Sequence, residues 1–108
     1  MKIKVDDITL GEGFPLVLIA GPCVVEGRDM ILKTAGKIQQ LARQYGIPFI
    51  FKSSYKKANR TSTSSFSTLG QDKALSILAE VKREFGIPLL TDIHTPEEAE
   101  GAAVITPA

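Results

Sequence analysis

The chain has 108 residues, with 13 lysines and arginines against 12 aspartates and glutamates and a formal net charge of +1. This length is that of one small domain, and the near-neutral charge argues against a general nucleic-acid-binding protein. The apolar runs fall well short of the ~20 residues that a membrane helix needs, and acids stand where a signal peptide would need its apolar core. We therefore expect a cytoplasmic protein with no membrane segment, and its single cysteine, Cys23, fits a reducing compartment.

An N-terminal arm precedes the first long strand. Lys2–Val5 and Ile8–Leu10 alternate in hydrophobicity on either side of Asp6-Asp7, which predicts a hairpin or an extended arm. The continuous apolar run Leu16–Ala20 predicts a strand covered on both faces, and it ends at the turn signal Gly21-Pro22.

Two amphipathic helices are predicted, each ended by a glycine. The first is expected to run from Asp29, as its cap, to about Tyr45, and the second from about Gln71 to Phe85. The residues expected on their buried stripes are Ile31, Leu32, Ala35, Ile38, Leu41, Ala42 and Tyr45 in the first helix, and Ala74, Leu78, Val81 and Phe85 in the second.

Each of these helices is followed by a predicted strand, Pro48–Lys52 and Pro88–Asp92. The joining sequence Tyr45-Gly-Ile-Pro48 recurs as Phe85-Gly-Ile-Pro88, forty residues later. Strands that alternate with helices in this way predict an α/β fold with a parallel sheet.

A third helix is expected to begin around Thr95-Pro96-Glu97-Glu98. Thr95 would be its cap, Pro96 its first residue, and Glu98 would complete a capping box. Ala103–Thr106 is then expected to begin a fourth strand.

Polar residues that could bind a ligand or take part in a reaction follow the predicted strands. They are Cys23, Lys52, Arg60, Asp92 and His94. The forty-residue period gives Lys52 and Asp92 equivalent places at their strand ends. In parallel α/β folds, ligands bind at this edge of the sheet.

A cationic segment, Phe51–Ser65, follows the second long strand. It places Lys52, Lys56, Lys57 and Arg60 within nine residues, and no acidic residue lies between Asp29 and Asp72. Lysine and arginine donors beside serine and threonine hydroxyls suit a phosphate ester or a carboxylate. The alternative is a solvated basic loop without a ligand.

Four motifs together resemble one enzyme family, and they are Ile19-Ala-Gly-Pro-Cys-Val-Val-Glu26, Phe51-Lys-Ser-Ser54, Lys57-Ala-Asn-Arg60 and Thr91-Asp-Ile-His94. They are similar to 3-deoxy-D-manno-octulosonate 8-phosphate (Kdo-8-phosphate) synthases, transferases of lipopolysaccharide precursor biosynthesis. The resemblance covers nearly the whole chain but only about the first two-fifths of a family member. It implies an incomplete (β/α)8 TIM barrel, one partial domain over 1–108, with a hairpin at 1–14 and the first three to four barrel strands at 15–108.

The resemblance also implies the reaction. Members of the family condense phosphoenolpyruvate with D-arabinose 5-phosphate, releasing phosphate, and they are usually homotetramers. Lys52 would lie near the phosphoenolpyruvate carboxylate, and Asp92 would orient a hydroxyl or a water near the sugar aldehyde, which makes these two the expected catalytic residues. The residues implied to bind arabinose 5-phosphate are Lys57, Asn59, Arg60 and Ser62.

Cys23 is the residue through which the resemblance implies a metal. Members with cysteine after Gly-Pro depend on a divalent ion (zinc, iron or manganese), and a thiolate suits such ions. Taken alone, a lone cysteine is more often a small buried apolar residue. The family's other metal ligands belong to later strands, and Ser65-Phe-Ser-Thr68 lacks an arginine that members usually carry.

Two other interpretations stay open. One is the related aromatic-pathway synthase, which uses erythrose 4-phosphate, although Lys57-Ala-Asn-Arg60 argues against it. The other is a non-catalytic, anion-binding or self-associating half-barrel. We expect a fragment that is inactive alone, because four strands cannot surround two substrates.

Overall fold

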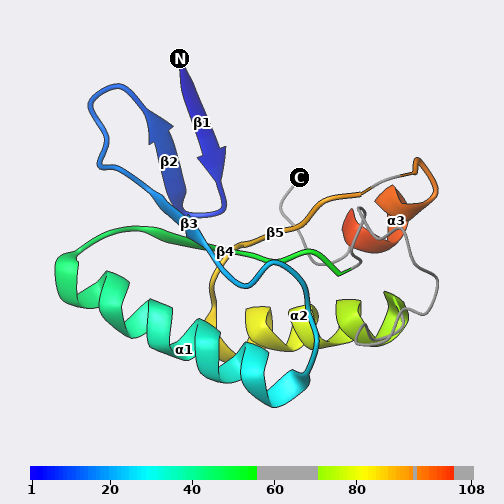
Figure 1. The fold of residues 1–108 in the computed structure, drawn as a ribbon. Coiled ribbons are helices and arrows are strands. Elements are labelled where there is room, and N and C mark those ends of the chain that lie inside the picture. The colour runs from blue at the N-terminus through cyan, green and yellow to red at the C-terminus, as the bar shows by residue number, and fades with distance from the viewer. Residues whose placement is uncertain (56–70, 94, 104–108) are drawn as a thin grey trace.

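A three-stranded parallel sheet with two helices along one side forms the body of the molecule (Figure 1). The computed structural model describes residues 1–55, 71–93 and 95–103. The sheet has the order β3-β4-β5, with β3 at Leu18–Ala20, β4 at Phe49–Lys52 and β5 at Leu89–Leu90. The predicted α/β fold with a parallel sheet is therefore confirmed, although the strands are shorter than the sequence pattern indicates.

An antiparallel hairpin precedes the sheet. Of the two predicted alternatives, a hairpin or an extended arm, the hairpin is therefore correct. Its strands are β1 at Lys2–Val5 and β2 at Ile8–Gly11, and Val5 pairs with Ile8 across a two-residue turn. Asp6 in this turn has a φ of 51°, the left-handed conformation that short hairpin turns require. The hairpin stands on the other side of the sheet from the two long helices (Figure 1).

The long helices are α1, Arg28–Tyr45, and α2, Gln71–Phe85, and a left-handed glycine follows each one. Gly46 has a φ of 67° and Gly86 a φ of 64°, so the predicted glycine caps are confirmed. After α1, the amide of Ile47 donates to the carbonyl of Ala42 at 2.9 Å, which closes the last turn. The repeated Gly-Ile-Pro sequence thus returns the chain to the sheet twice in the same way.

The start of α1 differs from the prediction. Gly27, in an extended conformation, occupies the N-cap position, and no side chain caps the helix. Asp29 instead lies in the first turn, where its negative carboxylate interacts favourably with the positive end of the helix dipole. The predicted Asp29 cap is wrong because the chain enters the helix two residues earlier.

The core lies between the two helices and the face of the sheet that they cover. Phe51, Ile31 and Val81 are fully buried there, and the Phe49 and Phe51 rings pack edge to face with centroids 6.2 Å apart. Burial on this scale is the main source of stability in so small a domain. Other members of the core are Val25, Ala35, Ala42, Tyr55, Ala74, Ile77, Leu78, Ile87 and Leu89.

The predicted stripe of α1 is only partly buried. Leu41 is 45% exposed and Tyr45 is 71% exposed, which contradicts their placement in the core. The helix packs mainly against α2 and β4, so apolar residues outside that contact stay in solvent. On α2 the prediction is closer, since Ala74, Leu78 and Val81 are buried and Phe85 is partly buried.

The opposite face of the sheet, called here the open face, carries Ile19, Ile50 and Leu90. Ile19 is 47% exposed and Leu90 is 40% exposed, so the prediction that the first strand is covered on both faces is wrong for this chain. The two long helices cover the other face, and β3 is an edge strand among the described residues. The hairpin and α3 partly flank the open face, leaving a cavity of about 430 Å³ that Val5 and Leu10 also line.

The last helix, α3, spans Glu98–Ala103 and begins later than predicted. Thr95 contributes its backbone carbonyl, which accepts from the amide of Glu98 at 3.1 Å, so a turn precedes the helix. Ala103 ends α3 and does not begin a strand, and the rest of the predicted fourth strand lies outside the described residues. Within residues 1–55, 71–93 and 95–103, no helix is both long and apolar enough to cross a membrane.

Candidate functional site

Three chain segments meet at the C-terminal edge of the parallel sheet. The backbone after β3 pairs with the backbone after β4 through a parallel bridge between Val24 and Ser54. The amide of Ser54 donates to the carbonyl of Cys23 at 3.1 Å, and the amide of Ser53 donates to the carbonyl of Leu90 at 3.2 Å. The turn after β3, the end of β4 and the end of β5 therefore form one continuous edge.

The strand pairing is staggered relative to the sequence repeat. The forty-residue period aligns Phe49 with Leu89, whereas the sheet pairs Phe51 with Leu89 and Lys52 with Leu90. Lys52 and Asp92 are thus equivalent in the repeat but are not opposite each other in the sheet. The two-residue shift keeps each side chain on its face, because side chains alternate with a period of two.

Asp92, the predicted aldehyde-side residue, lies opposite Ser54. The Ser54 hydroxyl donates to Oδ1 of Asp92 at 2.5 Å, and the Thr91 hydroxyl donates to the carbonyl of Ser53 at 2.8 Å. Ser54 belongs to one of the four sequence motifs, but it is not among the predicted site residues. Its position two residues after Lys52, on the same face of the strand, was the available signal.

Lys52 ends β4 on the open face, and its side chain is exposed. Its backbone lies against Gly21, where an added Cβ would come within 1.9 Å of the Lys52 carbonyl oxygen. Only glycine allows this close approach, which is why the turn after β3 begins with Gly-Pro. The contact fixes the Cys23 turn against the strand that carries Lys52.

Cys23 is an exposed free thiol next to this contact. Among the residues that the structure describes, no three or more histidine, cysteine, aspartate or glutamate side chains are placed to hold a metal ion together. A stable metal centre in proteins usually has at least three protein ligands. The described residues therefore do not form a metal centre by themselves.

Tyr55 anchors the end of β4 in the core, and sequence reasoning missed it. Its side chain is 2% exposed, and its hydroxyl interacts with the carboxylate of Glu98. Burial raises the pKa of Tyr55 to about 12, and the nearby carboxylates of Glu98 and Asp92 act in the same direction. The neutral phenol is therefore the form that this site stabilises.

The predicted sugar-phosphate residues Lys57, Asn59, Arg60 and Ser62 lie outside the described residues, and so does His94. The structure thus brings together three of the predicted positions, Cys23, Lys52 and Asp92, at one edge of the sheet. The remaining candidate residues stay predictions from the sequence.

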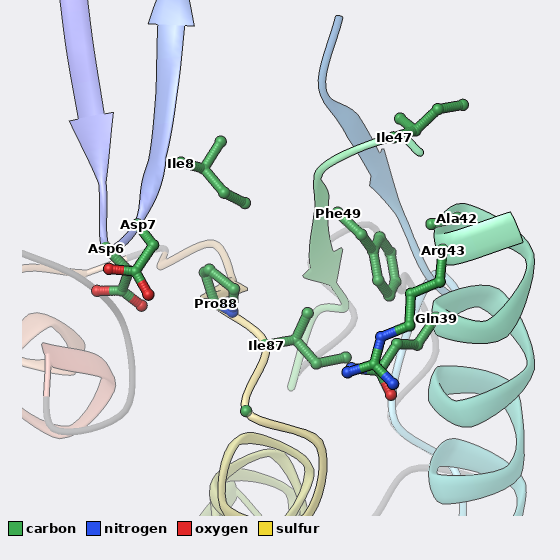
Figure 2. Close-up of a pocket in the computed structure, with 11 residues that line it drawn as sticks. Asp6, Asp7, Ile8, Gln39, Ala42, Arg43, Ile47, Phe49, Ile87 and Pro88 are labelled. Atoms are coloured by element: carbon green, nitrogen blue, oxygen red, sulfur yellow. The ribbon is translucent and has the colours of Figure 1, made fainter. Parts of the chain in front are cut away.

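A separate cavity of about 580 Å³ lies at the opposite edge of the sheet, next to the hairpin turn (Figure 2). Asp6 and Asp7 lie at one side and Arg43 of α1 at the other, with Phe49 between them. This cavity lies at the N-terminal ends of the strands, whereas every predicted site residue lies at or after the C-terminal end of a strand. Its size alone therefore does not make it the candidate site.

Comparison with known proteins supplies the family. A family model described as DAHP synthetase I family matches residues 1–106. The chain belongs to this family. Its motifs and its strand-end site can therefore be compared with those of other family members.

Several curated relatives share one name, 2-dehydro-3-deoxyphosphooctonate aldolase. That of Laribacter hongkongensis is 54% identical over 103 residues, which is 95% of this chain and 36% of the relative. That of an Azoarcus species is 50% identical over 96 residues, 89% of this chain and 34% of the relative. That of Bartonella bacilliformis is 45% identical over 105 residues, 97% of this chain and 37% of the relative.

The name is a synonym of Kdo-8-phosphate synthase, so the family resemblance drawn from the four motifs is confirmed. The chain spans little more than a third of the length of these relatives.

Proposed function

We propose that this chain is the N-terminal part of a Kdo-8-phosphate synthase, which joins phosphoenolpyruvate to D-arabinose 5-phosphate. The observation that carries the proposal is the shared name of relatives that are 45–54% identical over about nine-tenths or more of the chain. The strand-end edge with Cys23, Lys52 and Asp92 supports it, because parallel α/β proteins bind ligands at that edge.

The architecture of the whole protein would be a (β/α)8 barrel. Three features support this: the parallel order of the strands, the two-residue stagger between β4 and β5, and the packing of both long helices on the same face. Strands must be staggered for a sheet to close into a barrel. Later strands would cover the open face, and the hairpin would close the base of the barrel, beside the strand starts.

The proposed reaction forms one carbon–carbon bond. C3 of phosphoenolpyruvate attacks the aldehyde carbon of the sugar phosphate, water adds at C2, and the phosphate leaves with its bridging oxygen. The products are 3-deoxy-D-manno-octulosonate 8-phosphate and inorganic phosphate. Both substrates are anions, so positioning and charge stabilisation would supply most of the catalysis.

Each candidate residue has a defined task in this reaction. The Lys52 ammonium group would bind the phosphoenolpyruvate carboxylate, and Asp92 would orient a hydroxyl or a water near the aldehyde. The arabinose 5-phosphate site would consist of Lys57, Asn59, Arg60 and Ser62, with Arg60 and Ser62 nearest the phosphate. These residues follow the second strand, so both substrates would be held at the same edge.

Cys23 would be one ligand of a divalent metal in the longer protein, with zinc, iron or manganese as the candidates. When bound, such an ion would polarise the aldehyde or activate the water. The described residues contain no group of three such ligands, so the other ligands of the ion would come from elsewhere in the longer protein.

The protein would act in the cytoplasm, as a homotetramer like its proposed family, in lipopolysaccharide precursor biosynthesis. The erythrose 4-phosphate alternative is disfavoured by the names of the relatives and by the Lys57-Ala-Asn-Arg60 motif. The 108-residue chain alone would be inactive. Its half-exposed Ile19, Leu90 and Ile93 side chains favour self-association of the isolated chain, and sedimentation velocity would detect it.

The test is phosphate release from phosphoenolpyruvate in the presence of either sugar phosphate. A full-length protein can be made by placing residues 1–103 of this chain on the remainder of the Laribacter hongkongensis relative, with the unmodified relative as control. We expect release with arabinose 5-phosphate, loss of activity after chelation, and no release from the isolated chain. Release with erythrose 4-phosphate but not with arabinose 5-phosphate would contradict the proposal. Full activity after chelation would contradict the proposed dependence on a divalent metal.

A further inference from the structure

Ser54 connects all three segments that meet at the C-terminal edge of the sheet. Its amide donates to the carbonyl of Cys23 at 3.1 Å, and its carbonyl accepts from the amide of Val25 at 2.9 Å. Its hydroxyl donates to Oδ1 of Asp92. One residue therefore ties the turn after β3, through the end of β4, to the side chain that follows β5.

Asp92 lies beyond the last residue of β5, so the strand pairing does not fix it directly. That strand ends at Leu90, and Asp92 itself is not part of a strand or helix. A hydroxyl that donates to a carboxylate forms a charge-assisted bond, which is stronger and more directional than a neutral one. Alternation along β4 puts Ser54 on the open face, two residues after Lys52, so the bond holds Asp92 towards that face.

The neighbouring serine offers a comparison for the Ser54 hydroxyl. Ser53 is 1% exposed, and its hydroxyl has no hydrogen-bond partner within the described residues. Ser53 therefore shares the position at the strand end but not the bond to Asp92, which makes it the matched control. Ser54 is only half-buried, so water could have satisfied it, yet its hydroxyl is directed at the carboxylate.

We propose that Ser54 is a positioning residue for Asp92. Its hydroxyl holds the Asp92 carboxylate in the orientation needed at the aldehyde end, and its backbone fixes that carboxylate relative to the Cys23 turn. This role rests on the proposed synthase function, because it gives Asp92 a task in the same reaction.

The first experiment uses the full-length chimera with Ser54→Ala, Ser54→Thr and, as matched control, Ser53→Ala. Displacement of a reacting group by about 1 Å can cost up to 100-fold in rate, so we expect Ser54→Ala to lower kcat about tenfold. The KM for phosphoenolpyruvate should stay within about twofold, because Lys52 is untouched. Ser54→Thr keeps the hydroxyl and should retain most of kcat, and Ser53→Ala should match the parent.

A double-mutant cycle decides whether Ser54 acts through Asp92. In the Asp92→Asn background, Ser54→Ala should cause no further loss, since the carboxylate that it positions is gone. Additive losses would overturn the proposal, as would equal losses from Ser53→Ala and Ser54→Ala. Failure of Ser54→Thr to recover activity while its melting temperature matches the parent would overturn it too.

A second measurement does not depend on turnover, so it separates this inference from the proposed function. In the 108-residue chain, the two Hα–Hβ couplings of Asp92 report its side-chain rotamer by NMR. We expect unequal couplings in the parent, Ser54→Thr and Ser53→Ala chains, and averaged couplings in Ser54→Ala. Unchanged couplings in Ser54→Ala would overturn the positioning role, whereas an inactive parent chimera with these couplings would contradict only the synthase function.

Discussion

At the scale of single residues, Gly21 and Tyr55 hold the strand ends that carry the candidate site. Gly21 lets the Gly-Pro-Cys turn lie against the Lys52 carbonyl, and Tyr55 places a buried ring directly after the Ser53-Ser54 pair. Both residues act through packing, so their replacement should affect stability first and site geometry second.

Gly21→Ala should destabilise the chain strongly. The new Cβ would come within 1.9 Å of the Lys52 carbonyl oxygen and 2.9 Å of its carbon, and backbone atoms cannot move away cheaply. Overpacking of this kind typically costs about 1–3 kcal/mol, and we expect the upper part of that range. Urea unfolding measures the change. Gly101→Ala is the control, because its Cβ would meet only a Leu75 methyl group at 3.5 Å, and an equal effect in both variants would contradict the account.

Tyr55→Phe should change the pH dependence of stability. The pKa of Tyr55 is raised to about 12, above its ordinary value of 10.0, so the folded protein holds this proton more tightly than the unfolded chain does. The resulting stability is fully present below pH 10 and is lost as the pH rises towards 12. Tyr55→Phe should remove that loss and, at pH 7, stay within about 1 kcal/mol of the parent, because the change removes one hydroxyl interaction, with the partly exposed carboxylate of Glu98.

Denaturant unfolding of both chains between pH 7 and 12 measures this difference. Other groups that titrate in the range are common to the two chains and cancel in the comparison. Parallel stability curves for the parent and Tyr55→Phe above pH 10 would contradict the assigned environment of Tyr55.

At the scale of elements, local signals predicted most of the secondary structure. The hairpin around Asp6-Asp7 and the glycine ends of α1 and α2 were predicted correctly, because each depends on a few adjacent residues. The exposure of Ile19 and the late start of α3 could not be predicted from local sequence, because they depend on which neighbours each element contacts.

In the candidate site, too, local sequence predicts some features, and others depend on contacts between elements. The sequence places Cys23, Lys52 and Asp92 at strand ends, but the Ser54–Asp92 bond depends on the two-residue stagger of β4 against β5. The forty-residue repeat predicts strand equivalence and says nothing of that stagger, so it points to Lys52 as the counterpart of Asp92. The pairing of side chains across strands is a tertiary property.

The start of α1 offers a stabilising change. Gly27 is the N-cap, its carbonyl accepts from the amide of Ile31 at 3.2 Å, and nothing lies within 4 Å of an added Cβ. Gly27→Ser should stabilise the chain by about 0.5 kcal/mol, through a side-chain cap and a less flexible unfolded chain. Thermal unfolding measures it, and Gly27→Ala separates the two causes, since alanine cannot cap. A serine variant no more stable than the alanine variant would contradict the capping argument.

At the scale of the whole molecule, the chain has a core on one side of its sheet and a partly exposed apolar surface on the other. The side covered by α1 and α2 buries Phe51, Ile31 and Leu78, whereas the open face leaves Ile19 and Leu90 half-exposed. This asymmetry agrees with a chain that spans little more than a third of its relatives. The candidate site lies at one end of the open face.

The most direct test of the central claim gives the full-length chimera phosphoenolpyruvate together with equal amounts of arabinose 5-phosphate and erythrose 4-phosphate. Mass spectrometry then identifies the sugar acid that is formed. The account predicts the eight-carbon 3-deoxy-D-manno-octulosonate 8-phosphate as the dominant product, and its formation should fall when Asp92 is replaced by asparagine. A dominant seven-carbon product would contradict the account.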